Sequence, residues 1–205
     1  MARVADIHLD QVPDDVKPIY ERFAKDYGPF MNQVRVFAHR PPALKHIMGL
    51  LLDFYDQAVL PKRYLEIALV VVSKLSECKY CVAHHAPRLV DLGVDKIAVD
   101  RILDPQVPGF DAVDHLVRDY AVKVTNDSGR IRDGMFDALK QHFTEEQIVE
   151  LTLRTALCGF FNRFNDALMI DIEPGVIEDM SSRGFRVDEL PPSPRELQAE
   201  ADKAA

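Results

Sequence analysis

Hydrophobic positions recur at helical spacing along most of the chain, and only the first few residues show anything like the alternation of a strand. Two segments, residues 62–77 and 145–170, are apolar almost all round, as buried helices are. A third segment is apolar on one face only and begins after Pro41-Pro42. Its stripe consists of Leu44, Ile47, Met48, Leu51, Leu52 and Tyr55. The pattern predicts an all-α fold, a helical bundle with two central buried helices.

Capping residues mark where the predicted helices begin and end. Thr144 and Gln147 fit a capping box, and Ser193 and Glu196 fit a second one. Other boundary residues predict a helix over residues 14–27, a helix that starts at Pro61, and a helix that ends at Leu92 before Gly93. They also predict helices over residues 95–103 and from Asp111 to about 126–129. We expect one all-helical domain over residues 1–190. The polar segment 191–205 is expected to be either a frayed terminal helix or disordered.

Composition and charge narrow the class of protein. The chain has 205 residues and a formal net charge of -8, which argues against binding to nucleic acid and its phosphates. No apolar run approaches the roughly 20 residues that span a bilayer, so we expect no membrane partner. The start lacks a basic segment followed by an apolar one, so the expected location is cytoplasmic. In a reducing compartment, a Cys-x-x-Cys pair is more often catalytic or metal-binding than structural.

The segment "SECKYCVAHHA", residues 76–86, carries such a pair. Covalent haem attachment needs a histidine directly after the second cysteine, where this chain has Val82. A closed zinc site needs four ligands, and the remaining cysteine, Cys158, lies alone in an apolar helix and is interpreted as a core residue. A dithiol that cycles through a disulfide fits best, because a helix N-terminus can stabilise a thiolate. We therefore expect neither a metal nor a cofactor.

Two further residues extend the dithiol into a proton relay. His85 follows Cys81 by four residues, one helical turn, whereas His84 is less well aligned and is expected on the helix surface or behind the site. A turn near Ser76–Glu77 would fold the second helix back and bring Glu66 level with His85. Because Glu66 lies in an apolar helix, burial is expected to raise its pKa.

The spacing Glu66, eleven residues, Cys78, two residues, Cys81, three residues, His85 resembles the signature of AhpD-type alkylhydroperoxidases in the carboxymuconolactone decarboxylase family. The segment "LCGFFNRFNDAL", residues 157–168, is similar to the asparagine-containing helix of the peroxidase-related branch of that family. From the residues alone, Asn162, Asn165 and Asp166 could line a pocket or bind a facing helix, and the structural role is favoured because polar groups within helical cores usually satisfy partners.

The resemblance implies an AhpD-like all-helical fold that assembles into trimers or hexamers. It implies a thiol-dependent peroxidase or disulfide reductase in which Cys81 attacks, Cys78 is its disulfide partner, and Glu66 and His85 relay the proton. The implied partners are a hydroperoxide or another small molecule and a thiol protein or lipoamide-type electron donor. In place of the family's histidine before the second cysteine stands Tyr80, a poorer base at neutral pH.

Two rival functions remain open at this point. The family's other named activity, decarboxylation of a carboxymuconolactone-type acid, needs acid–base groups and an anion-binding Arg or Lys instead of a dithiol. A non-catalytic oligomeric protein with a vestigial motif would have thiols of ordinary pKa that form no disulfide.

Overall fold

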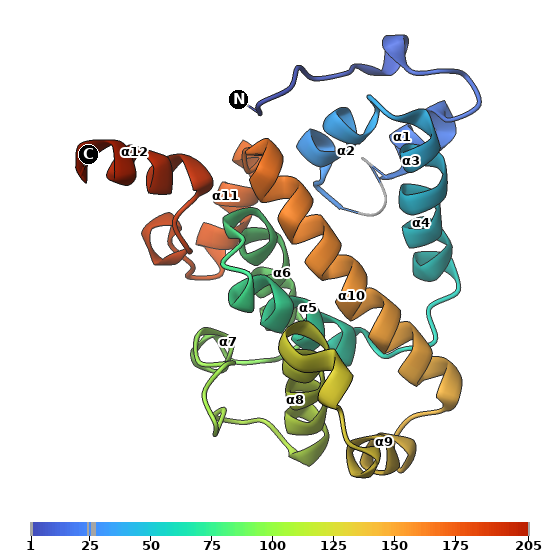
Figure 1. Ribbon diagram of the computed structural model, residues 1–205, viewed down its shortest axis with the longest axis vertical. Helices are drawn as coiled ribbons and strands as arrows, with labels where there is room; N and C mark the ends of the chain where they lie inside the picture. Colours follow the sequence, from blue (N-terminus) through green and yellow to red (C-terminus); the bar gives the residue numbers. More distant parts are fainter. Residues whose placement is uncertain (1, 24, 26–27, 205) are drawn as a thin grey trace.

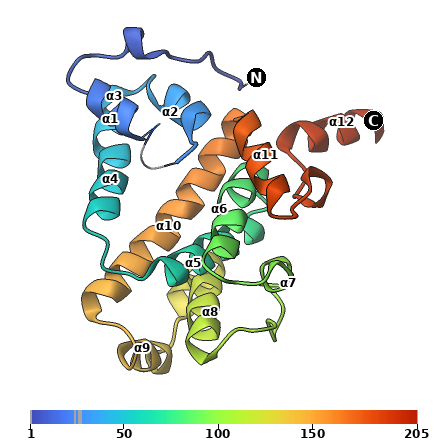
Figure 2. The same ribbon diagram turned by 180° about the vertical axis from the view of Figure 1, so that it is seen from behind.

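The computed structural model describes residues 2–23, 25 and 28–204, and every regular element within them is a helix. The all-α prediction is therefore confirmed for this part of the chain. Figures 1 and 2 show the arrangement from opposite sides. The α-helices are α1 (Lys17–Arg22), α2 (Met31–Phe37), α3 (Pro41–Ala43), α4 (Gly49–Asp56), α5 (Lys62–Leu75), α6 (Lys79–Asp91), α7 (Lys96–Asp100), α8 (Ala112–Asp127), α9 (Asp133–Lys140), α10 (Glu145–Leu168), α11 (Pro174–Ser182) and α12 (Pro194–Ala204).

Helices α5 and α10 are the two apolar helices predicted to be central. In α5, every residue from Glu66 to Ser73 is buried, and the helix packs against α6, α8 and α10. Long α10 crosses the molecule diagonally, between α5 and α6 on one side and α1 to α4 on the other (Figure 1). It begins at the predicted capping box, in which Thr144 accepts from the backbone of Gln147. These two helices therefore form the frame on which the cysteine segment is held.

The chain reverses between α5 and α6 at the predicted place. Glu77 has a left-handed φ of 52°, and Cys78 is the N-cap residue of α6. The reversal folds α6 back along α5. Consequently, residues 19 positions apart in sequence face one another across the two helices.

The N-terminal part departs from the prediction. The first α-helix begins at Lys17 and not at Asp14. Its N-cap residue is Val16, and no side chain caps the backbone there. The predicted end at Tyr27 lies outside the described residues. Helix α2 has no counterpart among the predicted helices, although it buries Val34 and Phe37 against neighbouring helices. At seven residues, it is too short for helical periodicity to stand out.

The C-terminal segment forms helix α12 in the structure, one of the two alternatives left open. Ser193 and Glu196 make the predicted capping box through their side chains. Glu196 also pairs with Lys79 at 2.8 Å, which joins α12 to the start of α6. None of the described helices is both long and apolar enough to span a bilayer.

Candidate active site

A hydrogen bond joins Glu66 on α5 to His85 on α6, as the sequence spacing predicts. Glu66 Oε2 lies 2.9 Å from His85 Nδ1, and both residues are buried. A carboxylate at Nδ1 places the proton of the neutral ring on that nitrogen, which leaves Nε2 as the basic position. The arrangement is that of a general base oriented by a third group.

The pKa of Glu66 lies below its ordinary value, so the expectation of a raised pKa is wrong. Burial alone would raise it, but the charge and hydrogen bond of His85 and the charges of Arg88 and Arg154 outweigh burial. The pKa of His85 is also lowered, chiefly because burial disfavours the charged ring. At neutral pH the pair is therefore a carboxylate and a neutral imidazole.

Cys81 and His85 line the same cavity, of about 40 Å³. The remaining wall is mostly apolar, with Phe30, Leu51 and Phe161 among its residues, and it includes the cationic residue Arg154. A space of this size holds a few water molecules or a peroxide group. The cavity therefore brings the nucleophile and the base of the predicted relay to one small space.

The thiol of Cys81 is protonated in this setting. Burial, followed by the hydrogen bond and charge of Cys78, holds its pKa well above the ordinary value. The expectation that the helix N-terminus stabilises a resting thiolate is therefore wrong, because the sulfur is enclosed by apolar walls. Both Cys78 and Cys81 are free and buried, and Cys78 contributes to the raised pKa of Cys81.

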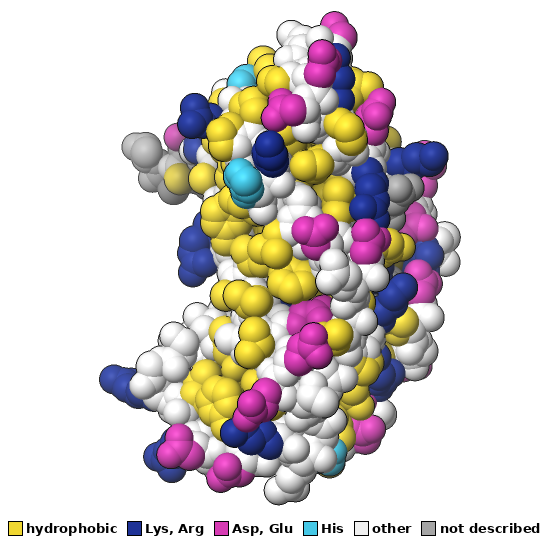
Figure 3. Space-filling model, turned by 90° about the vertical axis from the view of Figure 1, so that its right-hand side faces the viewer, with side chains coloured by type: hydrophobic (Ala, Val, Ile, Leu, Met, Phe, Trp, Pro, Cys, Tyr) yellow, Lys and Arg dark blue, Asp and Glu magenta, His cyan; other side chains and the backbone are white. Residues whose placement is uncertain are grey.

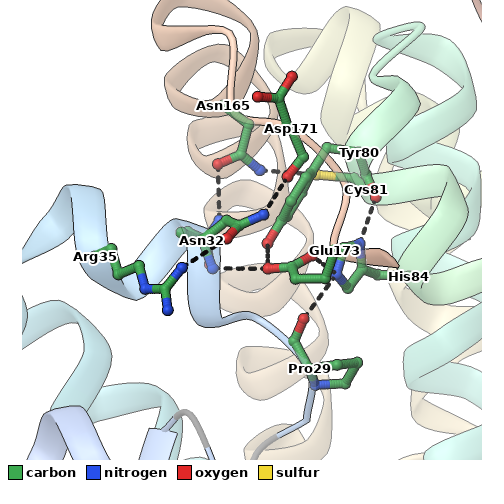
Figure 4. Close-up of polar contacts among 10 residues, drawn as sticks. Pro29, Asn32, Arg35, Tyr80, Cys81, His84, Asn165, Asp171 and Glu173 are labelled. Atoms are coloured by element: carbon green, nitrogen blue, oxygen red, sulfur yellow. Dashed lines mark hydrogen bonds and ion pairs between the residues drawn. The ribbon is translucent and has the colours of Figure 1, made fainter. Parts of the chain in front are cut away.

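Asn165 of α10 donates a hydrogen bond to the sulfur of Cys81 (Figure 4). The distance from Asn165 Nδ2 to Cys81 Sγ is 3.3 Å, and Gln33 of α2 fixes the amide by donating to Asn165 Oδ1 at 2.8 Å. This hydrogen bond opposes burial by lowering the pKa of Cys81. Asn162, one turn earlier, bonds the backbone oxygen of Val72 instead and has a structural role.

Asp166 is the corresponding partner of Cys78. Burial raises the pKa of Asp166 above its ordinary value, and the interaction with the Cys78 side chain offsets only part of this increase. Asp166 also lines a separate cavity of about 250 Å³, whose wall includes Lys79, Tyr80 and Arg195. The two thiols therefore have different polar neighbours, His85 and Asn165 near Cys81 and Asp166 near Cys78.

Comparison with solved structures identifies the fold. A peroxidase-related protein from Ralstonia eutropha JMP134, described as an alkylhydroperoxidase AhpD core, matches 85% of this chain and 94% of its own with a TM-score of 0.70 and 23% identity. A peroxidase-related protein from Silicibacter sp. TM1040 matches 84% and 92% with a TM-score of 0.65 and 21% identity. The fold is AhpD-like.

The AhpD-like fold also occurs in a debrominase. Bmp8, in complex with 2,3,4-tribromopyrrole, matches 88% of this chain and 96% of its own with a TM-score of 0.70 and 18% identity. No family model and no curated protein matches the sequence. The comparisons thus give the architecture.

Tyr80 and His84 belong to a second polar network of this protein, centred on Glu173 (Figure 4). Tyr80 donates its hydroxyl hydrogen to Glu173 Oε1 at 2.9 Å, and the Asn32 backbone N–H donates to the same oxygen at 2.8 Å. Burial and the neighbouring Glu173 hold the pKa of Tyr80 well above its usual value. Tyr80 is therefore a fixed hydrogen-bond donor in this structure and not a base.

His84 lies inside the molecule, although a helix-surface position was one of the two expected for it. Its Nδ1 faces the Tyr80 backbone oxygen at 2.7 Å, and its Nε2 faces Glu173 Oε2 at 3.0 Å and the Pro29 backbone oxygen at 3.1 Å. The ring therefore joins the α6 backbone to Glu173 and ties α6 to the start of α11.

Sequence reasoning missed Glu173 and Gln33, and it favoured a structural role for Asn165. Glu173 precedes Pro174 at the start of α11, where an acidic residue is expected for helix capping alone. Among the described residues, no group of three or more His, Cys, Asp or Glu side chains is arranged to hold a metal ion.

Proposed function

We propose that this protein is a thiol-dependent oxidoreductase that reduces a hydroperoxide with the Cys78/Cys81 dithiol. The observation that carries the proposal is the Glu66–His85 hydrogen bond at 2.9 Å beside the cavity that Cys81 and His85 share. A base oriented by a carboxylate next to a nucleophile is the arrangement that nucleophilic catalysis needs. The AhpD-like fold, with its peroxidase-related neighbours, supports the same reaction class.

In the first step, the sulfur of Cys81 attacks the outer oxygen of the peroxide. An S–O bond forms and the O–O bond breaks, which leaves a sulfenic acid on Cys81 and an alcohol. His85 takes the thiol proton as the sulfur attacks and returns it to the departing alkoxide. Glu66 stabilises the imidazolium that forms in between, and Asn165 stabilises the developing thiolate.

In the second step, Cys78 attacks the sulfur of the sulfenic acid. The S–S bond forms and water leaves, with the proton of Cys78 passing to Asp166 and on to the water. A dithiol donor, whether a small molecule of the lipoamide type or a thiol protein, then reduces the disulfide and becomes oxidised itself. Each cycle consumes one hydroperoxide and one donor dithiol.

Peroxide consumption by single variants tests the proposal. With cumene hydroperoxide and dithiothreitol, Cys81→Ser is expected to reduce the rate to that of the protein-free reaction, because the attacking sulfur is absent. His85→Gln should retain the thiol but lose the base, and lower the rate by on the order of 100-fold. The cavity-lining Cys158→Ser is the matched control and should keep the rate, since Cys158 bonds Ser73 and has a pKa of about 12. An unchanged rate in Cys81→Ser would refute the assignment.

A decarboxylase-type reaction is the second candidate, and one observation favours it. Arg154 lines the Cys81 cavity, and acid–base chemistry on a small organic acid needs a cationic residue of this kind. The debrominase Bmp8 has a similar fold, so removal of a halogen from a substrate should be assayed beside decarboxylation. A Cys78→Ser, Cys81→Ser double variant that keeps full turnover of an organic acid would favour the decarboxylase. Loss of all turnover favours dithiol chemistry.

A further inference from the structure

A closed ring of hydrogen bonds and short stretches of backbone links the Cys81 sulfur to Glu173, a carboxylate that has no role in the steps above. Glu173 is the N-cap residue of α11, and its side chain contacts both α2 and α6 (Figure 4). Its Oε1 accepts from the Tyr80 hydroxyl on α6 at 2.9 Å and from the Asn32 backbone N–H on α2 at 2.8 Å. One carboxylate oxygen therefore joins the cysteine segment to α2.

The ring is closed through the residues that come next in sequence. Gln33 follows Asn32 on α2 and donates to Asn165 Oδ1 at 2.8 Å. Asn165 on α10 in turn donates to the Cys81 sulfur at 3.3 Å. Cys81 itself follows Tyr80 on α6. The path through α2 and α10 therefore returns to α6 at the residue next to the one that it left.

The side chains that make up the ring are buried, so water competes little for its hydrogen bonds. Gln33, Tyr80, Asn165 and Glu173 all lie inside the molecule. Polar groups that are satisfied in such surroundings hold a defined geometry, and leaving one of them unpaired costs free energy. A shift of α2 relative to α6 would break a bond of the ring. Glu173 therefore restricts where the Asn165 amide can lie.

Glu173 also restricts the rotation of α6 about its own axis. Its Oε2 lies 3.0 Å from Nε2 of His84, which is one helical turn after Tyr80. The residues that follow these two in sequence are Cys81 and His85, and both line the active-site cavity. A rotation of α6 would therefore change the positions of the nucleophile and the base together.

The start of α2 is at the same time a wall of the active-site cavity. Phe30, the N-cap residue of α2, lines that cavity, and its ring stacks on the His84 ring with 4.5 Å between the ring centres. Asn32 Nδ2 also donates to the backbone oxygen of Asp171 at 2.9 Å, two residues before Glu173. Helix α2 is thus joined to the segment before α11 by two hydrogen bonds, beside the residue that forms the cavity wall.

We propose that Glu173 is a positioning residue of the reaction, which holds the Asn165 amide against the Cys81 sulfur by joining α2 to α6. This role deepens the function proposed above and rests on it for Cys81 as the attacking thiol. Glu173 does not line the Cys81 cavity, so it acts through Asn165, whose hydrogen bond favours the thiolate. Tyr80 thereby has a role of its own, because its hydroxyl is the α6 side of the join.

Alkylation of Cys81 by iodoacetamide tests this role without peroxide turnover. Trypsin cuts after Lys79 and so separates Cys81 from Cys78, and peptide mass analysis then gives the rate constant at Cys81 alone. Glu173→Ala is expected to slow the reaction at pH 7.5 by about tenfold and to shift its pH profile upward by about one unit, because a hydrogen bond to the thiolate is lost. Glu173→Gln keeps an oxygen that can accept both hydrogens, so its rate constant should stay within about twofold of that of the parent.

A double-mutant cycle separates this role from a general loss of packing. In the Asn165→Ala protein, Glu173→Ala should slow alkylation of Cys81 no further, because the bond through which Glu173 acts is already absent. Asp114→Asn is the matched control. Asp114 is a buried carboxylate of α8 that pairs with Arg63 of α5 at 2.6 Å, so this variant should be less stable and keep the pH profile of Cys81.

A milder variant gives the same information if Glu173→Ala does not fold. Tyr80→Phe loses only the hydroxyl that bonds Glu173. It should slow alkylation of Cys81 by about threefold in the parent and leave the rate unchanged in the Asn165→Ala protein.

Two results would overturn the inference: a pH profile of Cys81 that neither Glu173→Ala nor Tyr80→Phe changes, or full additivity of either variant with Asn165→Ala. If the parent still consumes peroxide, these results leave the proposed peroxidase in place. The expected alkylation pattern without any peroxide consumption would refute the peroxidase and keep the positioning role of Glu173.

Discussion

At the scale of single residues, the reactivity of Cys81 depends on a few polar neighbours that oppose burial. Its surroundings hold the thiol protonated, and Asn165 is the neighbour that favours the thiolate by a hydrogen bond. His85 is neutral and faces the same cavity. A protonated thiol is less readily oxidised than a thiolate. In the proposed reaction, the proton therefore leaves Cys81 only when the peroxide is in place.

Removal of the amide that contacts Cys81 should separate reactivity from stability. Asn165→Ala is expected to raise the pKa of Cys81 further and to slow peroxide consumption by about 10-fold, a typical effect of one lost hydrogen bond to a developing charge. The measurement is thiolate absorbance against pH together with the rate. Asn162→Ala, one turn away on the same helix, loses a bond to the Val72 backbone and should lower stability while leaving the pKa of Cys81 in place. Equal effects of both variants on the rate would contradict the role of Asn165.

The free energy of unfolding should fall on acidification, because Glu66 and His85 bind protons more weakly in the folded protein than in the unfolded chain. The folded pKa of His85 lies below its unfolded value of about 6.5, so below that pH the unfolded chain binds more protons than the folded one. Glu66, also lowered, adds to the loss below about pH 4.5. Urea unfolding at pH 7.5 and 5.5 should show a smaller decrease in His85→Gln than in the parent. An identical decrease in both proteins would show that His85 is not the group responsible.

The residues of the relay could be predicted from sequence because they lie on two helices joined by one short turn. Helical rise alone places Glu66 opposite His85 once the chain reverses at Glu77. Asn165, Gln33 and Glu173 could not be placed in the same way. They reach the motif from α10, α2 and the start of α11, and the register of those helices against α6 depends on tertiary packing. The direction of the Glu66 pKa shift was predicted wrongly because the charge and hydrogen bond of His85, together with the charges of Arg88 and Arg154, outweigh burial.

At the scale of helices, the turn between α5 and α6 decides where the site forms. The turn requires a left-handed residue at position 77, and the chain places an exposed glutamate there, with a φ of 52°. A residue with a Cβ is less stable in this conformation than glycine. The reversal that brings the relay together is therefore formed at some cost in backbone strain.

Relief of this strain should stabilise the protein. Glu77→Gly is expected to raise the free energy of unfolding by up to about 1 kcal/mol, measured by urea titration, without changing the hydrogen bond between Glu66 and His85. Ser76→Gly is the matched control, because Ser76 has an ordinary helical φ of -85° and should lose a few tenths of a kcal/mol. A destabilised Glu77→Gly variant would show that the side chain makes a stabilising contact that outweighs the strain.

The long helices were predictable, whereas several short ones were not. The apolar helices α5 and α10 and the capped α8 agree with the sequence pattern, because many turns and strong capping residues mark them. Helices α2, α9 and α11 have seven to nine residues and lie outside the predicted set. Their stability comes from packing of a few side chains on the long helices, and no local pattern shows this in the sequence.

At the scale of the whole molecule, α10 carries a stripe of exposed apolar residues on the side away from the core. Val149, Leu153 and Phe160 are 57%, 43% and 40% exposed. Hydrophobic side chains also gather over the middle of the face seen from the α4 side in Figure 3. The trimer or hexamer implied by the family resemblance stays a prediction, and these surfaces are where we propose that copies of the chain meet.

The molecule as a whole places one dithiol beside two cavities of different character. Cys81 lines the small, mostly apolar cavity that it shares with His85, whereas Asp166, the polar neighbour of Cys78, lines the larger cavity next to α12. In the proposed reaction, this difference suits Cys81 to the attack on a substrate and Cys78 to its resolution. The proposal rests on the claim that the two thiols form one redox pair.

Intact and peptide mass analysis after one equivalent of hydroperoxide tests that claim most directly. The reduced protein should lose two hydrogens and yield a single disulfide-linked peptide pair containing Cys78 and Cys81, with Cys158 still free. In Cys78→Ser, the same treatment should leave a sulfenic acid on Cys81. A parent protein that keeps three free thiols, or that oxidises first at Cys158, would contradict the account.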